Sequence, residues 1–311
     1  MKKTKAMKNN LLQMPALAKN QPVNVMPLQK RICVAVPTTG TVRIEWVMSR
    51  FGVTVPVNWS HGDFIYFYDQ YSPKNYVVAD ARNICVEYSI SEGFEWTFFL
   101  DHDVMLPADT FIKLNKYMTE MEYPIVSGLY YCKGSHPEPL VFRGRGNGYY
   151  GDWKFGDKFF VDGIPMGLCL IHNSILKAMY DERETYTVQS IMGPVAVRRV
   201  FETPRSAWRD TLTGKYISMG GTEDLPFFER ILRDNILKKA GWDKIAKKKY
   251  PYLVDSTIFA KHIDTLGMTY PSDGYLKQLS QYKGSKLEKM HKQGLNVVAK
   301  SAGSQYGGDS K

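Results

Sequence analysis

Apolar runs rich in β-forming residues, separated by helix-like segments, place the strongest constraint on how this chain can fold. Residues 30–40 (KRICVAVPTTG) read as a buried strand that ends in Pro and Gly. Residues 94–103 (FEWTFFLDHD) end a second apolar strand in two carboxylates, and residues 124–131 (PIVSGLYY) form a third. Helical spacing or helix-end signals between these strands predict βαβ units and therefore a parallel sheet of the α/β class.

The connecting segments have the expected helix signals. Residues 41–51 place apolar side chains at helical spacing, Asp80 is a candidate N-cap for a helix that ends at Gly93, and a further helix is predicted from Pro107 to Met118. Residues 53–59 and 64–68 are additional strand candidates.

The second half of the chain has a different texture. Residues 144–163 are rich in Gly and aromatic residues without a helical period, and residues 181–220 are polar and irregular. Between them, residues 166–176 (MGLCLIHNSIL) predict a strand that runs into a helix capped by Asn173. A helix is predicted over residues 221–241 and two short strands over residues 252–262.

The net charge of +10 belongs to the ends of the chain. Residues 1–30 contain six lysines and arginines and no acid, and residues 277–311 contain seven lysines and two acids, which leaves the middle close to neutral. We therefore predict a basic flexible tail over residues 1–29, one folded domain over residues 30–275, and a basic polar tail over residues 276–311. The charge pattern is not that of a nucleic-acid-binding core, and no nucleic-acid partner is expected.

The cysteines and the hydropathy indicate the cellular compartment in which the chain is expected. Cys33, Cys85, Cys132 and Cys169 lie in apolar runs without CxxC spacing, which favours buried free thiols and a reducing cytoplasm. No apolar run reaches the roughly 18 residues of a transmembrane helix. The chain is therefore expected in the cytoplasm, with peripheral membrane contact through its basic tails as an alternative.

The Asp101-His102-Asp103 sequence follows directly after an apolar strand. If the strand continued, the two carboxylates would point the same way with His102 opposite. Like charges that close destabilise each other, so the pattern indicates either a divalent cation, Mg²⁺ or Mn²⁺, or solvated acids at a strand end. An imidazole added to the ligands would favour Mn²⁺.

Two further segments carry candidate chemical groups. In residues 220–226 (GGTEDLP), Glu223 and Asp224 follow two glycines at the start of a helix. They could serve as a positioned general base, or could only compensate the helix dipole. His262 ends a predicted strand, where it is either a satisfied structural residue or a ligand.

The order of these motifs resembles the GT-A glycosyltransferases, and family 2 in particular. The resemblance covers about residues 31–265 and depends on the PTTG loop, the ARN sequence at residues 81–83, FFLDHD, MGLCLI, the TED helix start and the late histidine. It implies a GT-A fold: a Rossmann-like, mostly parallel sheet flanked by helices, with a smaller acceptor-side subregion. Residues 30–131 would be the nucleotide-binding half, and residues 132–275 the acceptor and catalytic half.

The resemblance also implies roles for individual residues. Nucleotide-sugar binding would fall to Pro37, Thr38, Thr39, Arg82, Asp101, His102, Met166 and Gly167. Asp103 and His262 would hold the metal, with Asp101 touching it or the ribose, and Gly167 would let the sugar approach closely. Asp224 would be the catalytic base, with Glu223 as the fallback, and Trp208 would form an acceptor-side wall.

The implied activity is metal-dependent transfer of a sugar from a nucleotide-diphosphate sugar, with UDP or GDP, to an acceptor hydroxyl. The acceptor would be a glycan, a lipid or a protein, the enzyme class a hexosyltransferase of EC 2.4, and the favoured stereochemistry inversion. A bound Mn²⁺ or Mg²⁺ would stabilise the leaving diphosphate, and one carboxylate base would remove the acceptor proton.

Two other classes remain open from the sequence. FFLDHDVMLP also fits the motif of haloacid-dehalogenase-like phosphatases, with Asp101 as nucleophile, but that motif normally follows the first strand of its domain, and about 70 residues of βαβ-like pattern precede it here. The basic tails alternatively suggest a protein that binds nucleic acid or an anionic membrane.

Overall fold

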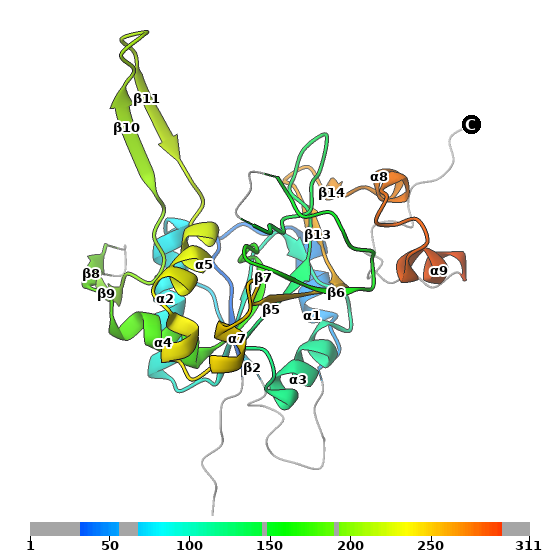
Figure 1. The fold of residues 1–311 in the computed structure, drawn as a ribbon, viewed down its shortest axis with the longest axis horizontal. Coiled ribbons are helices and arrows are strands. Elements are labelled where there is room, and N and C mark those ends of the chain that lie inside the picture. Colours follow the sequence, from blue (N-terminus) through cyan, green and yellow to red (C-terminus); the bar gives the residue numbers. More distant parts are fainter. Residues whose placement is uncertain (1–31, 56–67, 145–147, 190–192, 294–311) are drawn as a thin grey trace, which may run out of the picture.

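The computed structural model describes residues 32–55, 68–144, 148–189 and 193–293. Within these residues a seven-stranded central sheet has the order β2-β1-β3-β7-β5-β12-β6 (Figure 1). Its strands are β1 (Ile32–Ala35), β2 (Tyr68–Tyr71), β3 (Trp96–Leu100), β5 (Ile125–Leu129), β6 (Lys158–Val161), β7 (Leu168–His172) and β12 (Tyr252–Phe259).

Five of these strands run in the same direction. β1 is parallel to β2 and β3, and β5 is parallel to β12, while β7 is antiparallel to both β3 and β5, so that β3 and β5 point the same way. β6 is antiparallel to β12 at the edge. The predicted class, a mostly parallel α/β sheet flanked by helices, is confirmed.

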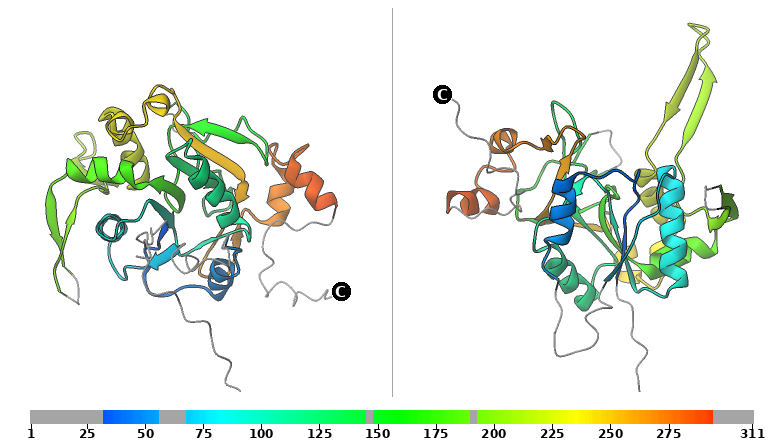
Figure 2. Two further views of the ribbon diagram at one scale, coloured as in Figure 1. Left: turned by 90° about the horizontal axis from the view of Figure 1, so that it is seen from below. Right: turned by 180° about the vertical axis from the view of Figure 1, so that it is seen from behind.

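Helices cover both faces of the sheet (Figure 2), which explains why β1, β3 and β5 are continuous apolar runs. Buried side chains of α2 (Val78–Ser91), α4 (Asn173–Asp181), α5 (Asp224–Arg233) and α6 (Ile236–Lys239) share one core with Ala35 and Phe99. α1 (Ile44–Phe51) and α3 (Thr110–Glu120) contribute to the core on the other face.

A second, three-stranded sheet lies beside the carboxyl end of β3. It consists of β4 (Val104–Met105), β13 (Lys261–Ile263) and β14 (Thr269–Tyr270), in the order β14-β13-β4. β4 pairs with β13 so that Val104 faces His262. This pairing brings together two segments that are almost 160 residues apart in the chain.

Several local predictions differ from the structure. The helix predicted over residues 221–241 begins at Asp224 and is interrupted at Asn235, whose φ is +53°, before α6 and the short α7 (Asp243–Ala246). The strand candidates at residues 53–59 and 64–68 lie mostly outside the described residues. α4 begins one residue early, because the His172 side chain rather than Asn173 caps it.

Residues 181–220, predicted to be irregular, contain two antiparallel hairpins. β8 (Thr185–Val188) pairs with β9 (Val195–Arg198), and β10 (Arg205–Arg209) pairs with β11 (Tyr216–Gly220). The β10–β11 hairpin projects well away from the rest of the molecule (Figure 1).

The basic C-terminal segment is folded as far as the structure describes it. Leu276 of α8 (Asp273–Gln278), Tyr282 of the connection and Leu287 of α9 (Lys286–Lys292) are buried in the same core as α2 and α4. Residues 276–293 therefore do not form the polar tail that we predicted, because a few apolar side chains anchor them. Residues 1–29 and 294–311 lie outside the described residues. None of the described helices combines the length and the apolar character needed to cross a bilayer.

Candidate active site at the carboxyl ends of the strands

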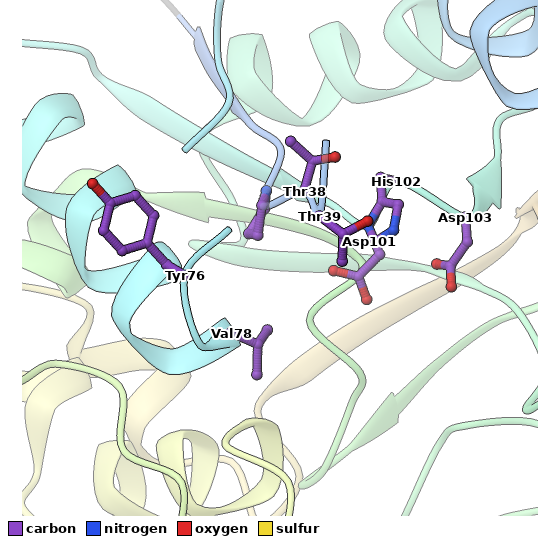
Figure 3. A pocket seen from close by; sticks show the side chains of 8 residues that line it. Thr38, Thr39, Tyr76, Val78, Asp101, His102 and Asp103 are labelled. Carbon is purple, nitrogen blue, oxygen red and sulfur yellow. The ribbon is translucent and has the colours of Figure 1, made fainter. Parts of the chain in front are cut away.

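The loops that follow β1 and β3 line one cavity of about 170 Å³. Pro37, Thr38 and Thr39 come from the first loop, and Asp101, His102 and Asp103 come from the second. In Figure 3 the two threonines lie between Tyr76 on one side and Asp103 on the other. The carboxyl ends of parallel strands are the usual ligand site of open α/β sheets.

Tyr76 and Val78 complete the lining of this cavity, and the sequence did not point to them. Both lie near the start of α2, next to the segment that follows β2. The available signal was an aromatic residue two positions before the start of α2, a pattern that is too common to select a site.

The Asp-His-Asp segment is a turn and not a continued strand. β3 ends at Leu100, and the Val104 amide donates to the Asp101 carbonyl oxygen at 3.1 Å. The Trp46 indole donates to that oxygen at 3.0 Å. The expectation that His102 would point away from the two carboxylates is therefore wrong in its geometry, because all three residues line the cavity.

Arg82 joins three carboxylates at the base of the site. Its guanidinium donates to Asp101 Oδ1 at 3.0 Å through Nη2, and it pairs with both Glu223 and Asp224 through Nη1. The Arg82 side chain is only 2% exposed. We predicted that Arg82 would face the nucleotide or its phosphates. Instead, its guanidinium pairs with three carboxylates of the protein itself.

This cluster holds more negative than positive charge. Burial alone would lower the pKa of Arg82, but the three carboxylates raise it, so the guanidinium stays charged. Burial raises the pKa of Glu223, with Arg82 acting in the opposite direction and Asp224 adding to the rise. Burial likewise raises the pKa of Asp101. Burial therefore makes Asp101 and Glu223 easier to protonate than they would be in water.

Asp224 is the more accessible of the two acids at the start of α5. Its side chain is 18% exposed, compared with 6% for Glu223. Besides the Arg82 contact, Asp224 Oδ2 accepts a hydrogen bond of 3.1 Å from the Met166 amide. The Asp224 carboxylate is therefore held by the Met166 amide and Arg82 while part of its side chain stays accessible to solvent.

Met166 and Gly167 contribute through their backbone. The Met166 side chain is fully buried in the core. A Cβ on Gly167 would overlap Asp101 Oδ2 and lie 2.6 Å from the Tyr130 hydroxyl. We expected the missing side chain of Gly167 to make room for a sugar, but the space is filled by Asp101 and Tyr130.

The structure brings Asp103 and His262 together, as the order of motifs predicted. His262 Nε2 lies 3.7 Å from Asp103 Oδ1, and His262 Nδ1 lies 2.6 Å from the Tyr131 carbonyl oxygen. A carbonyl oxygen can only accept, so Nδ1 carries the proton and the neutral ring presents the lone pair of Nε2 to Asp103. Burial lowers the pKa of His262 and Lys133 lowers it further, while Asp103 and Asp101 act in the opposite direction.

Lys133 pairs with the other oxygen of Asp103, Oδ2. Each carboxylate of the Asp-His-Asp turn thus has a cation from the chain itself, Arg82 for Asp101 and Lys133 for Asp103. These side chains already offset the repulsion between the two carboxylates, so the repulsion does not by itself require a metal ion. The metal site stays a prediction.

The donor set still fits a divalent cation. An imidazole lone pair and a carboxylate oxygen face each other, and the Tyr131 carbonyl orients the ring as an outer partner usually does at a metal site. Among the described residues, no three His, Cys, Asp or Glu side chains form a ready metal cluster. The remaining ligands would have to come from water or from a bound diphosphate.

Asn83, the third residue of the ARN sequence, and the predicted acceptor residue Trp208 are not among the residues that line the cavity. Asn83 receives the Phe201 amide at 2.7 Å and donates to the Phe201 carbonyl at 2.9 Å, so it supports the segment after β9. Trp208 belongs to β10 in the projecting hairpin, and its side chain is outside the described part of the structure.

Comparison with known proteins gives likenesses in fold alone. No family model and no curated protein matches this sequence. Among solved structures, the A197 protein from STIV is 18% identical, with 75% of this chain and 86% of that chain covered at a TM-score of 0.43.

Two structures of TarS from S. aureus are also similar. One, residues 1–349 in complex with UDP-GlcNAc, is 15% identical, with 47% of this chain and 46% of that chain covered at a TM-score of 0.30. The other is 11% identical, with 48% and 29% covered at the same TM-score. This chain thus spans less than half of either TarS chain. All three TM-scores are below 0.5.

Proposed function

We propose that this chain is a metal-dependent glycosyltransferase of the GT-A class, similar to family 2. It would transfer a sugar from UDP or GDP to a hydroxyl of a glycan, lipid or protein, as a hexosyltransferase of EC 2.4. The observation that carries the proposal is a convergence. The turn after β3 and the start of α5, about 120 residues apart, meet on the Arg82 guanidinium beside a cavity at the sheet edge.

The donor would bind in the cavity between the loops that follow β1 and β3. Thr38 and Thr39 offer hydroxyl and backbone groups to a ribose, and Tyr76 offers a ring face beside them for a base. His102 lines the same space. Asp103 and His262 would hold Mn²⁺ or Mg²⁺, which when bound supplies the positive charge that a departing diphosphate needs.

Asp224 is the group best placed to take the acceptor proton. It pairs with Arg82, is anchored by the Met166 amide and is partly exposed. The Glu223 side chain is only 6% exposed, compared with 18% for Asp224, so an acceptor hydroxyl would reach it less easily. One carboxylate opposite one leaving group gives transfer in a single step, with inversion at the anomeric carbon.

The pairing of Asp101 speaks against the phosphatase alternative. A phosphatase nucleophile needs a carboxylate oxygen free to attack, whereas Asp101 Oδ1 accepts from a buried arginine and Oδ2 lies against Gly167. In addition, β1 and β2 precede the motif in the sheet.

The test measures donor binding and transfer separately. A thermal-shift series with UDP, GDP, CDP and TDP, each with and without Mn²⁺, should give a metal-dependent rise for one nucleotide. Asp103→Asn should abolish that rise. Asp224→Asn should keep it and reduce transfer by about 10³-fold, because only the base is lost.

Asp109→Asn is the matched control, since Asp109 is exposed, directly precedes α3 and pairs with Lys113 of that helix at 2.8 Å. It should leave both readouts unchanged. Normal transfer by Asp224→Asn would remove Asp224 as the base. An unchanged Mn²⁺-dependent shift in Asp103→Asn would remove the metal site.

A further inference from the structure

Lys133 pairs with Asp103, the carboxylate that would hold a divalent cation in the proposed site. Its ammonium contacts Asp103 Oδ2, while His262 faces the other oxygen of the same carboxylate. One carboxylate therefore lies between a cationic side chain and an imidazole lone pair. A metal held by Asp103 and His262 would come close to this ammonium.

The backbone around Lys133 is fixed, so the contact is part of the fold. The Cys132 amide donates to the Glu138 carbonyl at 2.9 Å, and the Leu140 amide donates to the Tyr130 carbonyl at 3.1 Å. The carbonyl of Tyr131, two residues before Lys133, is the group that orients His262. One short segment after β5 thus supplies both the orientation of the imidazole and the competing cation.

The two cations of the Asp-His-Asp turn differ in their freedom to move. The Arg82 side chain is 2% exposed and is held by three carboxylates. The Lys133 side chain is 38% exposed and has a flexible stem. A cation entering from solvent could displace Lys133 from Asp103, but it could not displace Arg82 from Asp101.

We propose that Lys133 is an internal competitor for the metal: it occupies Asp103 when no metal is bound and must leave for a divalent cation to bind. This inference rests on the proposed metal site of the transferase. It makes Lys133 a residue that weakens metal affinity, which is the opposite of a ligand. Free Mn²⁺ would then bind weakly until the chain releases the carboxylate.

The test is Mn²⁺ binding to the full chain without nucleotide, measured by titration calorimetry. Lys133→Gln should bind Mn²⁺ about tenfold more tightly than wild type, because both the ion pair and the repulsion between cations are removed. Lys133→Arg keeps the charge and should stay within about threefold of wild type. Lys177→Gln removes the same charge from an exposed pair with Asp181 on α4 and should change nothing.

The remaining outcomes separate this inference from the proposed function. If Asp103→Asn abolishes Mn²⁺ binding but Lys133→Gln binds no more tightly than wild type, the metal site stands and the competition is refuted. If wild type and Lys133→Gln both fail to bind Mn²⁺ without nucleotide, the competition is refuted, and the proposed metal site falls as well if the Mn²⁺-dependent nucleotide shift is also absent. A tenfold gain in Lys133→Gln that disappears in the double variant with Asp103→Asn supports both.

Discussion

Gly167 illustrates how closely the site is packed at the level of single residues. Its amide donates to the Tyr130 hydroxyl at 3.1 Å, and its carbonyl accepts from the Asp101 amide at 3.1 Å. A methyl group at this position would overlap the Asp101 carboxylate. The glycine is therefore needed for close packing of the carboxylate cluster.

We expect Gly167→Ala to lower the free energy of unfolding by about 1–3 kcal/mol, the usual cost of overpacking a filled site. It should also displace Asp101 from Arg82 and weaken nucleotide binding. Urea unfolding and thermal shift with nucleotide measure the two effects. Gly274→Ala is the control, because an added Cβ there meets no atom within 4 Å. Equal stability of the two variants would show that the packing argument is wrong.

The residue types of the site could be predicted from the sequence, but their partners could not. The family resemblance implied the approach of Asp103 and His262, and the pairing of β4 with β13 brings the two residues together. The three carboxylates on Arg82 and the contact of Lys133 depend on which loops become neighbours after folding. A lysine in a loop gives no sequence signal of its target.

Among the elements, the buried strands were predictable and the exposed hairpins were not. β1, β3 and β5 are apolar throughout because helices cover both faces. β8 and β9 carry few buried side chains, so their apolar period is weak. A two-stranded hairpin that packs mainly on itself needs few buried apolar side chains, so its sequence shows little alternation of apolar and polar residues.

Exposed side chains of the β10–β11 hairpin should contribute little to the stability of the domain. Leu212 at its tip is 95% exposed and Tyr216 is 84% exposed. Replacing both by Ser should shift the melting temperature by less than about 2 °C, since exposed substitutions usually change stability by under about 0.5 kcal/mol. Leu276→Ser, at a buried position of α8, is the contrasting control and should lower it clearly.

The same hairpin leads directly into the acids of α5, because β11 ends at Gly220. With both substitutions at its tip, nucleotide and Mn²⁺ binding should remain at the wild-type level. A loss of donor binding would mean that the hairpin belongs to the donor site.

At the scale of the whole molecule, the sheet was predictable and the end of the domain was not. Residues 276–293 are rich in Lys and Gln, and only a few apolar side chains distinguish them from a solvated tail. Leu276, Tyr282 and Leu287 nevertheless enter the main core, and Lys261, only 6% exposed, pairs with Asp273 at the start of α8. Composition averages over a segment, whereas packing depends on a few positions in it.

Truncation after Pro271 should therefore destabilise the domain, while truncation after Gln293 should not. Loss of three buried side chains corresponds to about 5 kcal/mol, or a fall in melting temperature of at least about 10 °C. Leu287→Ala alone should cost about 2–3 kcal/mol. The comparison is made by thermal melting of the three variants. If all three melt with the full chain, α8 and α9 are dispensable to the fold.

The buried guanidinium of Arg82 also links the two halves of the molecule. It comes from the half that would hold the donor, yet two of its three partners belong to the half that would receive the acceptor. A substitution that changes the charge at Glu223 therefore alters the electrostatic environment of Asp101, and a charge change at Asp101 does the same at Glu223. Substitutions meant to change the donor preference would therefore also disturb Glu223 and Asp224 through Arg82. Exchanging one half of the molecule for that of another protein would leave Arg82 without matching carboxylate partners.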